Sequence, residues 1–143
     1  MKVQEKMERH GVAFQKIDLV RRAAAVLALA RPRQQMKNAL VLAGLVFSES
    51  LAKPVALLRT FEAVVSFCCA SGAVYALNDL LDRDADRAHP IKRLRPVASR
   101  MVSPRVAAGT AVGLGAVALA VAGQVSEAFL GTVAAYLAVH VGY

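Results

Sequence analysis

Apolar residues in this chain gather into long stretches that polar segments separate. Between Val106 and Ser126 no charged residue occurs over 21 positions, which is long enough for a helix to cross a bilayer. Three further stretches have a similar apolar character. We therefore predict an all-α fold, a polytopic membrane helix bundle with about four transmembrane helices. Their predicted ranges are about 34–51, 56–77, 104–124 and 127–143.

A shorter amphipathic segment precedes the first predicted span. Residues 1–17 are polar and mixed in charge, and they predict a surface tail. Residues 18–30 are helix-prone, with Asp18 placed as the N-cap, and Pro32 ends this helix. Its apolar part is too short to span a bilayer, so we expect an interfacial helix. Four arginines around that part suit an anionic membrane surface: Arg21, Arg22, Arg31 and Arg33.

The distribution of charge predicts the orientation of the bundle. The chain is 57% hydrophobic and carries 18 Lys and Arg residues against 10 Asp and Glu residues. Nine of the basic residues precede position 38 and seven lie in 78–105. Loops rich in Lys and Arg stay on the cytoplasmic side, so we expect a multi-pass cell-membrane protein with its N-terminus and the 78–103 loop cytoplasmic. Because the charge is confined to blocks beside apolar spans, nucleic-acid binding is not expected.

Two pairs of residues inside the predicted spans concern packing. Cys68 and Cys69 are adjacent, and neighbouring residues on a helix point in different directions. A disulfide between them is therefore not expected, and both are interpreted as packing residues. Gly109 and Gly113 have the spacing of small residues where membrane helices approach closely, so we expect them at a helix–helix contact.

An aspartate-rich segment, NDLLDRDADR over 78–87, follows the second predicted span directly. If the second helix continues through it, Asp79, Asp82 and Asp86 recur at i, i+3 and i+7 on one helical face, and Asp84 falls off that face. Like charges this close repel one another unless a cation lies among them. Carboxylates without His or Cys favour Mg²⁺ or Mn²⁺ over zinc, and Mg²⁺ completes its shell with water and phosphate. The pattern predicts a magnesium site that holds a diphosphate.

A basic segment, HPIKRLRP over 89–96, comes immediately after the aspartates. It sets Lys92, Arg93 and Arg95 within four positions, and these side chains are natural partners of phosphate oxygens. Acidic residues for a metal followed by basic residues for phosphate suit a reaction that releases diphosphate. Two other interpretations stay open: a solvated helix end whose aspartates pair with nearby arginines, and a basic anchor at lipid headgroups.

Lys37 and Asn38 begin the first predicted span and lie at the same predicted membrane depth as Asn78. Lys37 therefore either contacts phosphate beside the aspartates or extends to the membrane surface as an ordinary interfacial lysine.

Three stretches of the sequence resemble one known family. NDxxDxxxD over 78–86 is similar to the first aspartate motif of the UbiA-type intramembrane prenyltransferases. RPRQQMKN over 31–38 and DRAHPIKRLRP over 86–96 are similar to the RPxQxxKN and DRxHPxKRxRP stretches of its decaprenyl-phosphate phosphoribosyltransferase branch. The resemblance covers roughly 31–143. It implies a helical membrane enzyme whose Mg²⁺-bound diphosphate substrate lies in a cavity that opens to the cytoplasm.

The resemblance also implies a reaction and a set of site residues. Members of this branch transfer 5-phosphoribose from phosphoribosyl diphosphate to polyprenyl (decaprenyl) phosphate and release pyrophosphate, in cell-wall arabinan precursor synthesis. By the same resemblance Asp79, Asp82 and Asp86 are catalytic and hold the Mg²⁺–diphosphate. The implied substrate-binding residues are Lys37, Asn38, Asn78, Lys92, Arg93 and Arg95.

The chain departs from the family pattern at two points. Arg100 stands where the family usually has glycine, which tolerates backbone angles that arginine does not. The family also has more helices and a second aspartate motif, whereas Glu127 alone follows Arg105 among the acidic residues. We therefore expect residues 18–143 to be the N-terminal half of such a transmembrane domain, with negligible turnover alone. Its partner would be a missing C-terminal half or a second copy of the chain.

Two other functions stay open. A UbiA-type prenyltransferase that moves an isoprenyl group from its diphosphate onto an aromatic acceptor shares the aspartate motif without requiring the basic segment 89–96. A non-catalytic membrane segment that packs against partner helices would use Gly109 and Gly113 for that contact.

Overall fold

The computed structural model describes residues 20–21, 23–47 and 52–142. The predicted tail 1–17, the Asp18 cap and Arg22 lie outside those residues. Within them every regular element is a helix, which confirms the all-α prediction. Residues 20–21 and 23–29 are helical. The elements that follow are the 3₁₀ helix η1 (Pro32–Leu40), α2 (Val41–Phe47), α3 (Pro54–Leu81), α4 (Arg83–Ala88), the 3₁₀ helix η2 (Lys92–Leu94), α5 (Pro104–Val125) and α6 (Glu127–Gly142).

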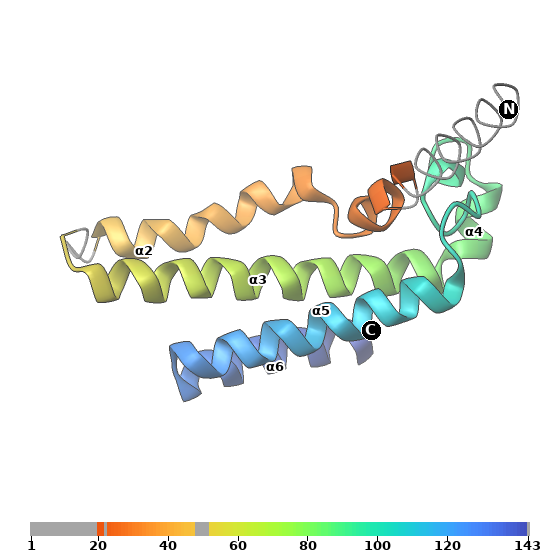
Figure 1. The fold of residues 1–143 in the computed structure, drawn as a ribbon. Coiled ribbons are helices and arrows are strands. Elements are labelled where there is room, and N and C mark those ends of the chain that lie inside the picture. The colour runs from red at the N-terminus through yellow and green to blue at the C-terminus, as the bar shows by residue number, and fades with distance from the viewer. Residues whose placement is uncertain (1–19, 22, 48–51, 143) are drawn as a thin grey trace, which may run out of the picture.

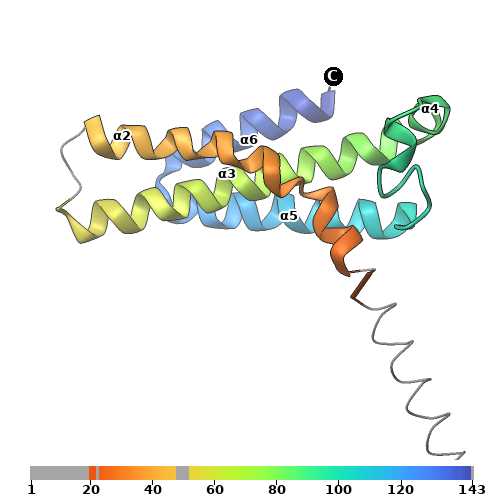
Figure 2. The ribbon, with the colours of Figure 1, turned by 90° about the horizontal axis from the view of Figure 1, so that it is seen from above.

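Helix α3 forms the centre of an elongated bundle (Figures 1 and 2). Helix α2 runs along one side of α3, while α5 and α6 pack as a hairpin against it on another. The carboxyl end of α2, the start of α3 and the turn from α5 to α6 lie at one end of the bundle (Figure 1). The helical residues 23–29, helix α4 and the connection from α4 to α5 lie at the other end. The aspartate-rich and basic segments therefore share an end with the start of η1.

Serine caps define both helices of the C-terminal hairpin. The Ser103 hydroxyl accepts a hydrogen bond from the backbone N–H of Val106 at 3.3 Å, and Pro104 occupies the first turn of α5. The Ser126 hydroxyl accepts from the backbone N–H of Phe129 at 3.1 Å and starts α6 in the same way. Both helices begin at the residues that the sequence predicts, because these caps are local features.

The first predicted span, 34–51, is not one α-helix. The chain follows a 3₁₀ path through η1 before the short helix α2, and residues 48–51 lie outside the described ranges. In a 3₁₀ helix residues i and i+3 share a face. Gln35 and Asn38 use that spacing, and the Asn38 amide donates to the Gln35 side-chain oxygen at 2.7 Å. The Gln35 amide donates in turn to the carbonyl of Ala30 at 2.6 Å, which ties η1 back to the preceding helical segment.

Among the described helices, α3 and α5 are long and apolar enough to cross a membrane. Helix α6 is shorter, with 16 residues. Large apolar side chains are exposed on α2, α3, α5 and α6, as expected of helices that lipid or other helices cover. They include Phe47, Phe61, Val112 and Val139. The count of four spans and the interfacial helix stay predictions.

Small side chains form the core shared by α3, α5 and α6. Ala70, Ala118, Ala122 and Val133 are fully buried there. The buried hydroxyl of Ser66 donates to the carbonyl of Ala118 at 2.8 Å and links α3 to α5. Cys69 is partly buried against this core, as the packing interpretation predicts for it, and Cys68 is half-buried.

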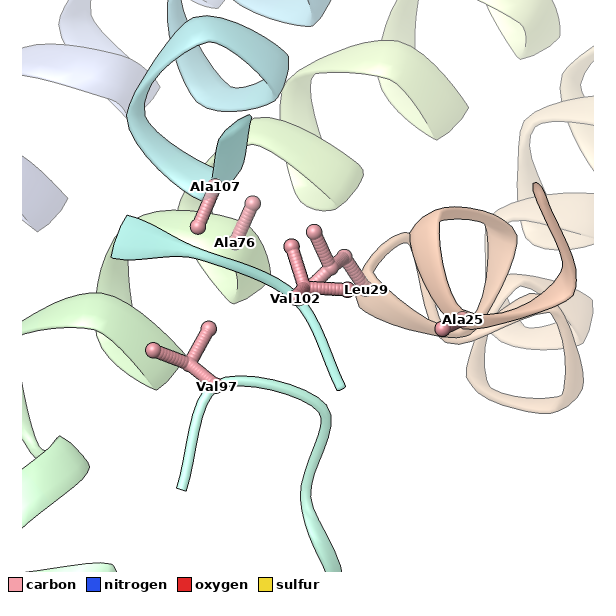
Figure 3. Packing of buried hydrophobic residues seen from close by; sticks show 6 residues of the cluster. All are labelled: Ala25, Leu29, Ala76, Val97, Val102 and Ala107. Atoms are coloured by element: carbon pink, nitrogen blue, oxygen red, sulfur yellow. The ribbon is translucent and has the colours of Figure 1, made fainter. Parts of the chain in front are cut away.

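A second apolar cluster gathers residues from distant parts of the chain (Figure 3). Leu29 and Val97 are its largest fully buried members. Leu29 lies in the first helical segment (residues 20–21 and 23–29), and Val97 lies in the α4–α5 connection. Its buried residues are Ala25, Leu29, Ala76, Val97, Val102 and Ala107. The cluster anchors the connection against α3 and holds the basic segment over the carboxyl end of that helix.

The prediction that Gly109 and Gly113 lie at a helix contact is wrong within this chain. A Cβ atom built on either glycine meets nothing within 4 Å. Gly72 is the glycine at which a side chain would be crowded, since a Cβ there would lie 3.1 Å from Leu114 and 3.4 Å from Ala30. The two glycines of α5 have the spacing of a helix contact face, but in the folded chain that face points away from the other helices.

Candidate active site

Two buried carboxylates share one guanidinium at the carboxyl end of α3. Asp79 and Asp86 are 1% and 2% exposed. Arg95 Nη1 lies 2.7 Å from Asp86 Oδ2 and 3.6 Å from Asp79 Oδ1. Buried carboxylates require a counter-charge, because burial without one disfavours the ionised form. Arg95, from the α4–α5 connection, supplies that charge to both, so it joins a carboxylate of α3 to a carboxylate of α4.

Arg31 is the second cation at this position. Its Nη2 lies 2.5 Å from Asp79 Oδ1, and its guanidinium lies 4.7 Å from the centre of the Tyr75 ring. The Arg31 backbone has φ of 48°, a left-handed conformation that a non-glycine residue adopts at a cost. The chain uses this conformation to leave the helical segment 23–29 and enter η1. The ion pair and the ring contact therefore hold a side chain at a tight corner of the backbone.

The carboxylates of Asp82 and Asp84 do not join the buried pair. Helix α3 ends at Leu81, and Asp82 has φ of −82° and ψ of 0° before α4 begins. This interruption breaks the straight helix that the predicted i, i+3, i+7 face requires, and Asp82 is exposed. Asp84 is exposed as well and pairs with Arg87 at 2.7 Å, as the interpretation of a solvated helix end predicts for that residue. Among the described residues, no group of three metal-ligating side chains forms.

Lys37 and Asn38 contact α3 between about one and three turns before Asp79. The Lys37 ammonium donates to the Tyr75 hydroxyl at 2.9 Å and lies 5.5 Å from the centre of its ring. The Asn38 amide donates to Ser71 Oγ at 3.3 Å and to Cys68 Sγ at 3.7 Å. Both side chains therefore turn toward α3.

The remaining predicted residues lie around this cluster. Asn78 is half-buried, and its carbonyl accepts the backbone N–H of Asp82 at 2.9 Å. Lys92 and Arg93 are exposed in η2, so of the three predicted phosphate partners in the basic segment only Arg95 reaches the buried carboxylates. His89 accepts backbone N–H bonds from Ile91 and Lys92 at 3.2 Å, which shapes the turn before η2.

Sequence reasoning assigned no site role to Arg31 or Tyr75. Tyr75 precedes Asp79 by four residues, so it lies on the same face of α3 one turn earlier. That spacing is present in the sequence, but a tyrosine in an apolar helix is ordinary. Only the packing of η1 against α3 reveals that Arg31 and Lys37 both contact its ring.

The residues present fit a divalent cation in one respect and not in another. Asp79 and Asp86 converge on a single positive charge, and Mg²⁺ commonly takes one or two protein carboxylates with phosphate and water completing its shell. An arginine supplies that positive charge here, and Asp82 is exposed. Asp79 and Asp86 would hold a divalent cation only with Arg95 turned away, and a diphosphate is a suitable new partner for its guanidinium.

A comparison of the sequence with models of known families identifies one family. The profile described as the UbiA prenyltransferase family matches residues 38–143. The chain belongs to that family. The resemblance drawn from the motifs is therefore confirmed. Enzymes of this family are membrane transferases that generally use divalent metal ions.

Curated relatives carry a more specific name. The decaprenyl-phosphate phosphoribosyltransferase of Mycobacterium tuberculosis is 38% identical over 130 residues, covering 84% of this chain and 41% of the relative. The enzyme of the same name from Mycolicibacterium smegmatis is 39% identical over 127 residues, covering 84% and 39%. The one from Corynebacterium glutamicum is 33% identical over 125 residues, covering 85% and 38%. This chain thus spans about two fifths of the length of these relatives.

Proposed function

We propose that this chain provides the donor-binding part of a UbiA-family transferase that moves 5-phosphoribose from phosphoribosyl diphosphate to polyprenyl phosphate. The names of the relatives support this donor and acceptor. The cell membrane is the proposed location, with the basic end of the bundle facing the cytoplasm. We propose Mg²⁺ as the metal, because a site of carboxylate oxygens without His or Cys favours it.

The convergence of Asp79 and Asp86 on Arg95 is the observation that carries this proposal. It gathers two carboxylates and a guanidinium, the groups that a metal-bound diphosphate requires, from three separate elements. Two buried carboxylates are not expected at an ordinary solvated helix end, since burying a charge without a strong partner is unfavourable. Asp82 has a weaker role in this proposal than the motif implies, because its side chain is exposed.

The chain's own residues contribute binding and orientation. When bound, a divalent cation neutralises charge on the diphosphate leaving group. Asp79 and Asp86 would hold that cation, and Arg95 and Arg31 would then bind phosphate oxygens in place of their carboxylate partners. Tyr75 positions Lys37 and Arg31 through its hydroxyl and its ring. The acceptor phosphate is itself the nucleophile, so the reaction requires no protein nucleophile.

Titration calorimetry of the detergent-solubilised chain with phosphoribosyl diphosphate, with and without Mg²⁺, tests the proposal. Binding is the appropriate measurement, because the chain spans only part of its relatives' length. We expect Mg²⁺-dependent binding that Asp79→Asn and Asp86→Asn each weaken by at least about tenfold. Asp84→Asn is the matched control, since it removes the same charge from an exposed position nearby.

Two results would count against this function. Equal binding by the wild type, Asp79→Asn and Asp86→Asn, with helix content intact, would show that these carboxylates hold no donor. Tighter binding of an isoprenyl diphosphate than of phosphoribosyl diphosphate would instead favour a prenyltransferase that uses an aromatic acceptor.

A further inference from the structure

A separate cleft lies between the first helical segment and the start of α5. It has a volume of about 540 Å³ and shares no residue with the cluster around Arg95. One wall comes from Arg21 and Val26, and the other comes from the end of the α4–α5 connection and the first turn of α5. The buried cluster of Ala25, Leu29 and Val102 holds these walls together (Figure 3). The cleft is therefore a defined part of the fold.

Two arginines face this cleft from opposite walls. Arg21 comes from the first helical segment and Arg100 from the connection that precedes α5, and both are exposed. No acidic residue lines the cleft among the described residues. Two guanidinium groups without a carboxylate between them favour an anion, and phosphate oxygens match the planar donor geometry of arginine.

The remaining lining is mostly apolar. The walls between the arginines are formed by Val26, Met101, Val102 and Val106. Met101 and Val106 are 58% and 46% exposed, so the apolar lining continues onto the outer surface of the bundle. A soluble phosphate compound gains little from such walls, whereas an acyl or prenyl chain that lies along them removes apolar surface from water. The combination suits a phosphate that carries a hydrocarbon chain.

Arg100 is held in this position at a cost. Its φ of 63° is a left-handed conformation, in which glycine is favoured and an arginine is strained. The only backbone bond that the Arg100 N–H donates among described residues goes to the carbonyl of Val97 at 3.2 Å. A residue that the backbone disfavours is consistent with a side chain that serves another purpose.

We infer that this cleft binds the phosphate of an anionic membrane lipid, with Arg21 and Arg100 holding the phosphate and the apolar wall holding the start of the hydrocarbon chain. The site is separate from the cluster around Arg95, and the inference rests on the proposed function only if polyprenyl phosphate, the proposed acceptor, is the better-retained lipid. The bound lipid would rest against the α4–α5 connection, the segment that also carries Arg95.

Native mass spectrometry of the detergent-solubilised chain tests this inference. The probes are phosphatidylglycerol, polyprenyl phosphate, zwitterionic phosphatidylcholine and inorganic phosphate. We expect the chain to retain the two anionic lipids in preference to phosphatidylcholine, and inorganic phosphate not to compete at equal concentration. Arg21→Gln and Arg100→Gly should each weaken retention of the anionic lipids by about fivefold, the effect typical of one basic side chain at a lipid surface.

The variants are chosen so that folding does not confuse the result. Arg100→Gly removes the charge and relieves the left-handed backbone, so the variant should fold at least as well as the wild type. Arg100→Lys retains the charge and should retain most of the lipid. Arg83→Gln removes one arginine from the same end of the molecule but outside the cleft, and it should leave retention unchanged.

Retention that depends on Arg21 and Arg100 supports the inference, and the better-retained anionic lipid identifies the source of the phosphate. Equal retention by the wild type and both variants would overturn it, as would an equal loss in Arg83→Gln. Competition by inorganic phosphate at equal concentration would also overturn it, because the cleft would then recognise a free anion.

Discussion

The middle and the carboxyl end of α3 are held in the bundle by different kinds of interaction. In its middle, α3 packs against α5 and α6 through alanines, with one buried hydroxyl bond from Ser66 to Ala118. At its carboxyl end, two carboxylates are buried beside the apolar cluster, Asp79 of α3 and Asp86 of α4, and arginines from other parts of the chain neutralise them. Both regions are well packed, but the loss of stability when one side chain is removed should differ between them.

The difference is one of specificity. An alanine contact is made by short-range dispersion, and a neighbouring methyl group can replace a lost one in part. A buried carboxylate has no such substitute, because its partner must carry the opposite charge at hydrogen-bond distance. The carboxyl end of α3 thus depends on a few named side chains, while the alanine-rich region depends on the close approach of whole helices. Four substitutions test this contrast, from the largest expected effect to the smallest.

Arg95→Ala should have the largest effect. It leaves Asp86 buried without an ion-pair partner among the described residues, and breaking a buried pair in this way costs about 3 kcal/mol. The free energy of unfolding in detergent, followed by circular dichroism, measures the loss. Arg93→Ala removes the same side chain two positions earlier, where it is exposed, and should change stability by less than about 0.5 kcal/mol. Equal effects of the two substitutions would show that the buried cluster does not stabilise this end.

Gly72→Val should be the most harmful substitution in the region of close helix approach. Its Cβ would lie 3.1 Å from Leu114 Cδ1 and 3.4 Å from Ala30, so the helices must separate or the leucine must move, at a cost of about 2 kcal/mol. Gly113→Val is the control, because nothing lies within 4 Å of its Cβ position. Thermal unfolding of both variants in the same detergent would refute the close approach if Gly113→Val were the more damaging.

Ser66→Ala should have a smaller effect. It removes the hydroxyl that donates to the Ala118 carbonyl and should lower the free energy of unfolding by about 1 kcal/mol. Thr132→Val removes a hydroxyl that bonds only within its own helix, to Ala128 at 3.0 Å, and should change stability less. A chemical unfolding series that ranks Thr132→Val above Ser66→Ala would contradict the role of the bond between α3 and α5.

Arg100→Gly should have the smallest effect, and it should be stabilising. Glycine adopts a φ of 63° without the clash that arginine makes, which favours the folded chain by up to about 1 kcal/mol. The midpoint of thermal unfolding should rise slightly, whereas Arg105→Gly, inside the first turn of α5, should lower it because glycine weakens a helix. A fall in the midpoint for Arg100→Gly would mean that its side chain contributes more to folding than its backbone costs.

The sequence by itself determined the helical class, the caps and the family. Ser103 with Pro104 and Ser126 with Glu127 mark helix starts, because a cap depends on neighbouring residues alone. The aspartate and basic motifs pointed to the UbiA family for the same reason, since they are short and contiguous in the chain. Both motifs directly follow the second apolar stretch, so the sequence also indicated the carboxyl end of that helix as the location of the chemistry.

Only the tertiary structure decided which charged residues meet. The spacing of Asp79, Asp82 and Asp86 predicts one shared face, but the interruption at Asp82 exposes that residue and leaves two buried carboxylates on Arg95. Arg31 lies 48 positions from Asp79 in the chain, so no local pattern connects them. Gly113 and Gly72 differ in the same way, because only the packing of α3 against its neighbours selects which face is covered. Local pattern sets the helices, and long-range packing sets the partners of each charge.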